Sequence, residues 1–150
     1  MNDGRGDAPS RLLRRAVDVH GALTAAIVAF QLAMAAGAPW GRWAMAGAWP
    51  GAWPPALRLA ALGQALLLLA FTLVLRARIG RSPRAWGRAS RWLVWGVVAV
   101  NGVSAALNLA TPSAAERMLW APVAVGLLAC SALVAWRAPA HPPGAAASPT

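Results

Sequence analysis

Five amide and hydroxyl side chains interrupt the apolar stretches of this sequence and are the residues best placed to do chemistry. They are Gln31, Gln64, Asn101, Ser104 and Asn108. The last three recur at i, i+3 and i+7, a spacing that places them on one face of a helix. Polar side chains in apolar surroundings seek hydrogen-bond partners inside the protein. The five residues therefore indicate either structural contacts between helices or a site for a ligand or a permeating solute.

Residue types that carry catalysis or bind metals are sparse. The chain has two histidines, of which only His20 lies in an apolar stretch, so haem held by two histidines is not indicated. No cluster has the spacing of zinc ligands. Ser104 and Ser131 lack a base at comparable depth, and Asp18 and Glu116 lie at the ends of apolar stretches. The sequence indicates no catalytic residue, no metal and no cofactor, and favours a protein that is not an enzyme.

Four apolar stretches must position these side chains. The chain of 150 residues is 59% hydrophobic and 12% charged, which is too apolar for a soluble domain of this size. About 20 apolar residues in a helix cross a hydrocarbon core of about 30 Å. We therefore predict an all-α, four-transmembrane-helix, up-down-up-down bundle with spans at about 17–36, 56–75, 92–110 and 118–136. Residues 1–16 are predicted to be a cytoplasmic tail and residues 137–150 a disordered one.

The formal net charge of +10 comes entirely from arginine and lies between the apolar stretches. That distribution does not form the contiguous basic surface of a nucleic-acid-binding protein, so no nucleic-acid partner is predicted. Eleven arginines fall on the side of the two termini and three on the other. Because cytoplasmic loops carry the positive excess, we predict a multi-pass protein of a bacterial plasma membrane with both termini cytoplasmic. Its expected partners are membrane lipids and either further copies of itself or another membrane protein.

The first apolar stretch has two distinct faces. One is a seam of alanines, which we predict to lie against a neighbouring helix because small residues let helix backbones approach closely. The opposite face carries polar residues and is expected to point into the bundle, with His20 near the cytoplasmic end beside Asp18. The seam consists of Ala22, Ala26, Ala29, Ala33 and Ala36, and the polar face of His20, Thr24, Ile27 and Gln31.

Two connections carry local signals. The Trp-rich segment, residues 37–55, holds four tryptophans among closely spaced Gly and Pro, and only one charge, Arg42. Such a segment is unlike a disordered chain, and we predict an ordered cap over the outer mouth of the bundle, above the amides. Before the fourth stretch, Ser113 and Glu116 have the spacing of a capping box.

Several short motifs resemble those of a group of uncharacterised bacterial four-helix membrane proteins. The motifs are Gly37-Ala38-Pro39-Trp40-Gly41, Asn108-Leu109-Ala110-Thr111, Glu116-Arg117 and Trp120-Ala121-Pro122. The resemblance covers about residues 20–136. It departs from the group at residues 44–47, where Ala-Met-Ala-Gly replaces an expected Trp-Gly-Gly. The resemblance implies the same architecture and implies no activity.

Three function hypotheses follow. The first is a non-enzymatic module that binds a lipid, a partner protein or a small neutral ligand through the five polar residues. The alternative is a minimal transporter or channel subunit that acts as an oligomer. A lipid-modifying enzyme is the hypothesis that the sequence favours least.

Overall fold

A computed structural model of the chain describes residues 10–81 and 89–138, and in these ranges the chain is almost entirely helical. Four long helices are joined by one extended connection and two shorter ones. The extended connection contains two single turns of 3₁₀ helix, η1 (Gly41–Trp43) and η2 (Met45–Gly47). The long helices are α1 (Arg11–Ala35), α2 (Pro55–Arg78), α3 (Ser90–Ala110) and α4 (Ala114–Arg137).

Local signals in the sequence set the helix ends. The hydroxyl of Ser10 accepts a hydrogen bond from the backbone N–H of Leu13 at 3.3 Å and so begins α1. Gly37 adopts φ +100° just past α1, and Ala38 N–H then bonds Ala33 C=O at 2.9 Å, a glycine C-cap. Helix α2 begins at Pro55. Proline fits the first position of a helix because the backbone N–H that it lacks would have no helical partner there.

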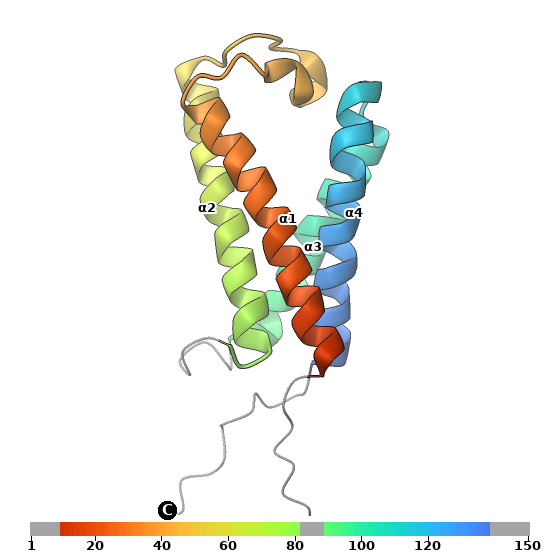
Figure 1. The fold of residues 1–150 in the computed structure, drawn as a ribbon. Coiled ribbons are helices and arrows are strands. Elements are labelled where there is room, and N and C mark those ends of the chain that lie inside the picture. Colours follow the sequence, from red (N-terminus) through yellow and green to blue (C-terminus); the bar gives the residue numbers. More distant parts are fainter. Residues whose placement is uncertain (1–9, 82–88, 139–150) are drawn as a thin grey trace, which may run out of the picture.

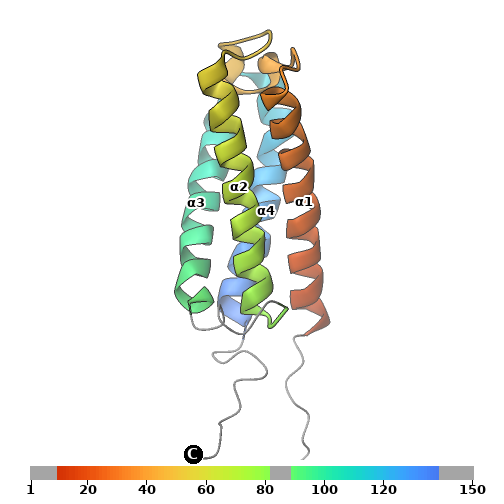
Figure 2. The ribbon, with the colours of Figure 1, turned by 90° about the vertical axis from the view of Figure 1, so that its left-hand side faces the viewer.

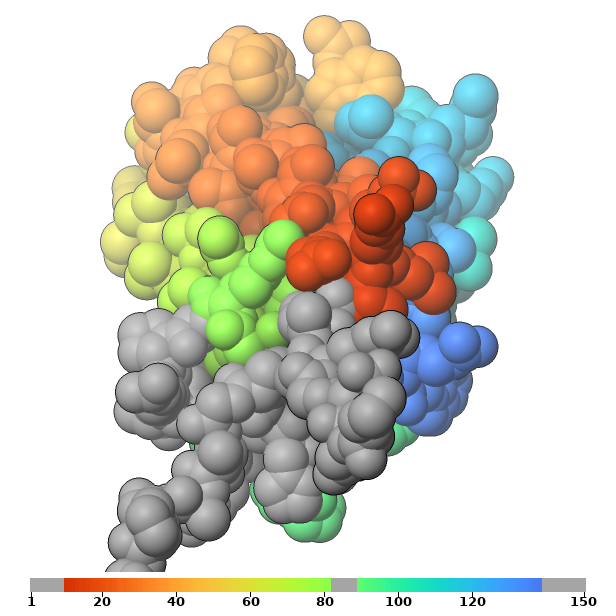
Figure 3. Space-filling view, turned by 60° about the horizontal axis from the view of Figure 1, so that its bottom comes forward, coloured from red at the N-terminus to blue at the C-terminus, as the bar shows by residue number. Residues whose placement is uncertain are grey.

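Successive helices run in opposite directions and form a four-helix bundle (Figure 1). One end, here called the loop end, carries the Trp-rich segment and the α3–α4 turn. The other, the basic end, gathers the helix termini at Arg11, Arg78, Ser90 and Arg137. Figure 2 shows the four helices side by side along their lengths. Viewed from the basic end, α1 lies between α2 and α4 (Figure 3).

The helix pairs α1–α2 and α3–α4 meet at the basic end and separate towards the loop end (Figure 1). Apolar side chains from all four helices fill the space between them where they meet. We call this cluster the basic-end core; its fully buried members include Leu75, Val94, Val97 and Val134. At the loop end a smaller cluster of Met34, Trp53 and Ala61 joins α1, the Trp-rich segment and α2. Packing is therefore tightest at the basic end.

The predicted all-α four-helix fold is confirmed, and the chain is a multi-pass membrane protein because all four helices are long and apolar enough to cross a bilayer. The helices extend past the predicted spans, which were drawn on apolar residues alone. Helix α1 starts at Arg11, inside the predicted tail of residues 1–16, because Ser10 caps it there. The predicted disordered tail lies outside the described residues from position 139 onwards.

The prediction that the alanine seam packs against a neighbouring helix is wrong for the single chain. Ala22, Ala26, Ala29 and Ala36 are exposed and Ala33 is half-buried. The opposite face is turned inwards, with His20, Thr24 and Gln31 buried and Ile27 half-buried. The physical reason is that polar groups find no hydrogen-bond partners in hydrocarbon. Their need for partners decides which way α1 faces, and the alanines are left outside.

Candidate functional site

A cavity of about 350 Å³ lies between the two helix pairs at the loop end, where the pairs separate. All four helices and the Trp-rich segment contribute to its walls. The five residues predicted as ligand-binding, Gln31, Gln64, Asn101, Ser104 and Asn108, all line it. The structure thus brings them together in one place; that they bind a ligand stays a prediction.

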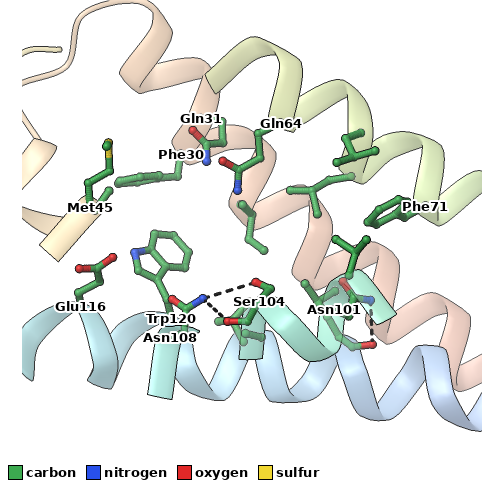
Figure 4. A pocket seen from close by; sticks show the side chains of 18 of the residues that line it. Phe30, Gln31, Met45, Gln64, Phe71, Asn101, Ser104, Asn108, Glu116 and Trp120 are labelled. Carbon is green, nitrogen blue, oxygen red and sulfur yellow. Dashed lines mark hydrogen bonds between the residues drawn. The ribbon is translucent and has the colours of Figure 1, made fainter. Parts of the chain in front are cut away.

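The five polar residues form two facing rows (Figure 4). Gln31 from α1 and Gln64 from α2 lie side by side, with their amide groups directed across the cavity. Asn101, Ser104 and Asn108 lie along α3 on the other side. The i, i+3, i+7 spacing of the α3 row is what places all three on the cavity face. Aromatic and aliphatic side chains fill the walls between the rows, including Phe30, Leu68, Phe71, Trp120 and Leu127.

The α3 row is held by hydrogen bonds within the protein. The Asn101 side chain is buried, and its Nδ2 donates to Ser131 Oγ at 3.2 Å and to Leu127 C=O at 3.5 Å, both on α4. Asn108 Nδ2 donates to the Ser104 C=O of its own helix at 2.8 Å. Asn101 therefore acts as a structural link between α3 and α4, and the Asn108 amide nitrogen is bonded within its own helix.

The glutamine row is different, because neither amide has a hydrogen-bond partner among the described residues. Gln31 is 6% exposed, and its Oε1 is buried without a donor. Gln64 is exposed towards the cavity and its opening. A buried polar group without a partner destabilises a protein. The two glutamines are thus not explained by contacts between helices.

Trp53 adds a third unpartnered group. It is 5% exposed and lines the cavity, and its indole Nε1 is buried without an acceptor. Its position is fixed by Arg58, whose Nε donates to Trp53 C=O at 2.7 Å. Trp53 was not among the residues predicted for the site. The sequence feature that could have identified Trp53 is its position directly before Pro54-Pro55. These prolines lead the chain into the start of α2, beside the mouth of the cavity.

The Trp-rich segment closes the loop end of the cavity by docking on α4. Ala46 N–H donates to Glu116 Oε2 at 2.7 Å, and Trp120 Nε1 donates to Trp43 C=O at 2.6 Å. The predicted ordered cap is thus present, although Trp43 is 36% exposed and Trp49 is 48% exposed. They lie at the end of the bundle, where tryptophans meet the membrane interface.

Glu116 differs in part from its predicted capping role. Ser113 Oγ accepts from the Glu116 N–H at 3.3 Å, which is the first half of the capping box. The Glu116 carboxylate instead accepts from Ala46 N–H and from the Thr111 hydroxyl at 3.2 Å. It therefore ties the Trp-rich segment to the start of α4, a contact that depends on tertiary structure and has no local signal.

A second polar group lies between α1 and α2, nearer the basic end. The hydroxyls of Thr24 and Thr72 each lie 3.4 Å from Nδ1 of His20 and 3.3 Å from each other. These three residues are called the His20 cluster. His20 is only 1% exposed, so it points into the bundle, as predicted for the polar face of α1. Asp18 pairs with Arg81 at 2.7 Å.

Charge at the cavity limits its chemistry. Glu116 is the one ionisable residue among its described lining residues, and its carboxylate is already hydrogen-bonded. No Arg or His contributes to the described lining. Within residues 10–81 and 89–138, no group of three His, Cys, Asp or Glu side chains is placed to bind a metal ion. The cavity offers neutral donors and acceptors between apolar walls, an arrangement suited to binding an uncharged molecule.

Comparison with known proteins gives no match: no family model fits the sequence, and no curated protein or solved structure matches the chain. The resemblance to four-helix bacterial membrane proteins, drawn from short motifs, stays a prediction.

Proposed function

We propose that this chain is a bacterial plasma-membrane protein that binds a small uncharged ligand in its loop-end cavity and catalyses no reaction. The observation that carries the proposal is a cavity whose apolar walls hold two facing rows of neutral polar side chains: Gln31 and Gln64 on one side, and Asn101, Ser104 and Asn108 on the other. The Gln64 amide has no hydrogen-bond partner among the described residues and is exposed, so it can bond a ligand. Binding sites typically combine apolar walls with a few such groups.

Binding is favoured over the alternative of transport by the shape of the interior. Conduction requires a polar path from the cavity to the basic end. Beyond the cavity the described interior contains the His20 cluster and then the basic-end core, in which Leu75, Val94 and Val134 are fully buried. Enzymatic chemistry lacks support because Glu116 has no second ionisable group facing it among the described residues that line the cavity.

The arginine asymmetry supports an orientation in which both termini face the cytoplasm. The cavity then lies in the outer half of the membrane under the Trp-rich segment. This orientation belongs to the proposal, as does the relation to the bacterial four-helix group that the sequence motifs resemble.

Native mass spectrometry of protein purified in mild detergent tests the proposal. The wild-type protein is expected to retain a small molecule. Ser104→Phe puts a ring into the cavity and should lower the retained fraction about tenfold, the effect of losing roughly 1.4 kcal/mol of binding. The matched control is Ala106→Phe, which adds the same ring on an exposed site of α3 and should retain the molecule. Equal retention by both variants, or a wild-type protein that carries nothing, would contradict the proposal.

A further inference from the structure

We propose that the outer surface of the α3–α4 pair at the basic end binds one anionic glycerophospholipid, with the lipid phosphate on Arg91 and the acyl chains along the tryptophans beside it. This site is separate from the loop-end cavity and does not depend on the binding function proposed for that cavity.

Three exposed tryptophans lie at the basic end of α3 and α4. Trp92, Trp95 and Trp136 are 79%, 43% and 71% exposed. The rings of Trp95 on α3 and Trp136 on α4 meet edge to face, with their centroids 6.0 Å apart. The two helices therefore present one aromatic surface across their interface. Because both helices cross the membrane and these residues lie near their ends, the surface faces lipid near the headgroups, where tryptophan is preferred.

Arg91 extends this aromatic surface towards the end of the bundle. It precedes Trp95 by four residues, so it lies one helical turn nearer the basic end on the same side of α3. Its side chain is exposed, and it pairs with no carboxylate among the described residues. A guanidinium group bonds a phosphate through two parallel N–H groups. Arg91 is therefore placed to hold a phosphate beside the tryptophans.

The charge of the basic end selects the kind of headgroup. Among the described residues this end carries arginines from all four helices, such as Arg15, Arg76 and Arg137, and a single acidic residue, Asp18. The Asp18 carboxylate already pairs with Arg81 at 2.7 Å. Positive charge at a membrane surface attracts lipids of net negative charge. The basic end therefore favours an anionic lipid over one whose headgroup has no net charge.

The tryptophans alone would also suit a choline headgroup, because an ammonium ion binds over the face of an aromatic ring. The guanidinium of Arg91, one turn from Trp95, opposes a second cation at this place. The tryptophans are instead available to the rest of the lipid. Their exposed rings can pack on the first part of the acyl chains, and an indole N–H can donate to an ester carbonyl group.

The test uses the full-length protein, freed of lipid in detergent and titrated with phosphatidylglycerol or phosphatidylcholine of the same acyl chains. Native mass spectrometry measures the Kd of the first bound lipid. We expect phosphatidylglycerol to bind about tenfold more tightly, and Arg91→Gln to remove that preference. The matched control is Arg76→Gln, which removes an exposed charge of α2 at the same end and should preserve it.

A second pair of variants tests the aromatic surface. Trp136→Leu should weaken phosphatidylglycerol binding about fivefold through the lost ring contacts. Trp49→Leu removes a tryptophan that is 48% exposed at the loop end and should leave the Kd unchanged.

Three results would overturn the site. An unchanged preference in Arg91→Gln, or equal losses in Arg91→Gln and Arg76→Gln, would show only a diffuse attraction of the basic end for anionic lipid. Tighter binding of phosphatidylcholine would show that the tryptophans recognise choline. Ser104→Phe, which fills the loop-end cavity, should leave phosphatidylglycerol binding unchanged; loss of binding in this variant would assign the lipid to that cavity.

Discussion

Gln31 and Asn101 are both buried amides in apolar helices, yet their surroundings assign them different roles. The Asn101 amide reaches across to α4 and bonds Ser131, so it stabilises the packing of α3 on α4. Gln31 Oε1 is equally buried but has no donor among the described residues. Sequence alone could not separate the two cases, because each residue is an amide within an apolar stretch. The difference depends on which side chains face each amide, and that is decided by tertiary packing.

Opposite effects on stability follow from this contrast. Gln31→Leu removes an unpaired buried acceptor and should stabilise the empty protein by about 1 kcal/mol. Asn101→Leu removes an interhelical hydrogen bond and should destabilise it by about 0.6 kcal/mol. Thermal unfolding of both variants in detergent, with lipid removed, measures the two changes. A melting temperature that falls for Gln31→Leu would show that Gln31 is a structural contact.

At the scale of elements, the sequence was sufficient to predict where the four helices lie in the chain. It was insufficient to predict every face that a helix turns towards its neighbours. Apolar length identified all four helices, and the spacing of Ser113 and Glu116 marked the start of α4. The start of α1 was predicted six residues too late, because Ser10 caps the helix before Arg11. The polar face of α1 points into the bundle as predicted, whereas the packing of its alanine seam on another helix was predicted wrongly, because small size and polarity give competing signals for burial. Polarity prevailed: the His20 cluster and Gln31 are inside, and the alanine seam is outside.

Packing of α2 against the loop end gives a direct test of which alanines are buried. Ala61 is 1% exposed and packs with Met34 and Trp53. Ala61→Leu should therefore destabilise the protein by about 2 kcal/mol through overpacking. Ala29→Leu adds the same volume on the exposed seam and should leave the melting temperature unchanged. A comparable loss for Ala29→Leu would mean that another helix, from a second copy or a partner, covers the seam.

The folded shape of the Trp-rich segment requires the backbone at Gly41 to lie close to the backbone of Trp49 and Gly51. A Cβ at Gly41 would overlap the carbonyl oxygen of Trp49 and lie 2.7 Å from that of Gly51, whereas a Cβ at Gly51 meets nothing within 4 Å. Gly41→Ala should therefore loosen the segment and speed trypsin cleavage after Arg42, which is already exposed, while Gly51→Ala should not. Limited proteolysis compares the cleavage rates after Arg42. Equal rates in the two variants would contradict the fold proposed for the segment.

At the scale of the whole molecule, orientation follows from charge. Eleven of the fourteen arginines lie on the side of the termini, so reporter fusions after residues 84 and 150 should both report the cytoplasm. A fusion within the Trp-rich segment should report the opposite side. An external signal after residue 84 or 150 would reverse the assignment and place the cavity in the cytoplasmic half.

The architecture as a whole favours a cavity at one end, because the helix pairs meet at the basic-end core and separate towards the Trp-rich segment (Figure 1). The sequence indicated that five polar residues belong together, and all five line that cavity. It did not indicate the space itself, which arises from the angle between the helix pairs and is specified by no local pattern.

An experimental structure of the protein extracted from its membrane in mild detergent tests the central claim most directly. We expect density for a non-protein molecule in the cavity, between the glutamine row and the α3 row and in contact with the Gln64 amide. A cavity closed by inward movement of α2 onto α3, with the Gln31 amide bonded to a neighbouring helix, would contradict it.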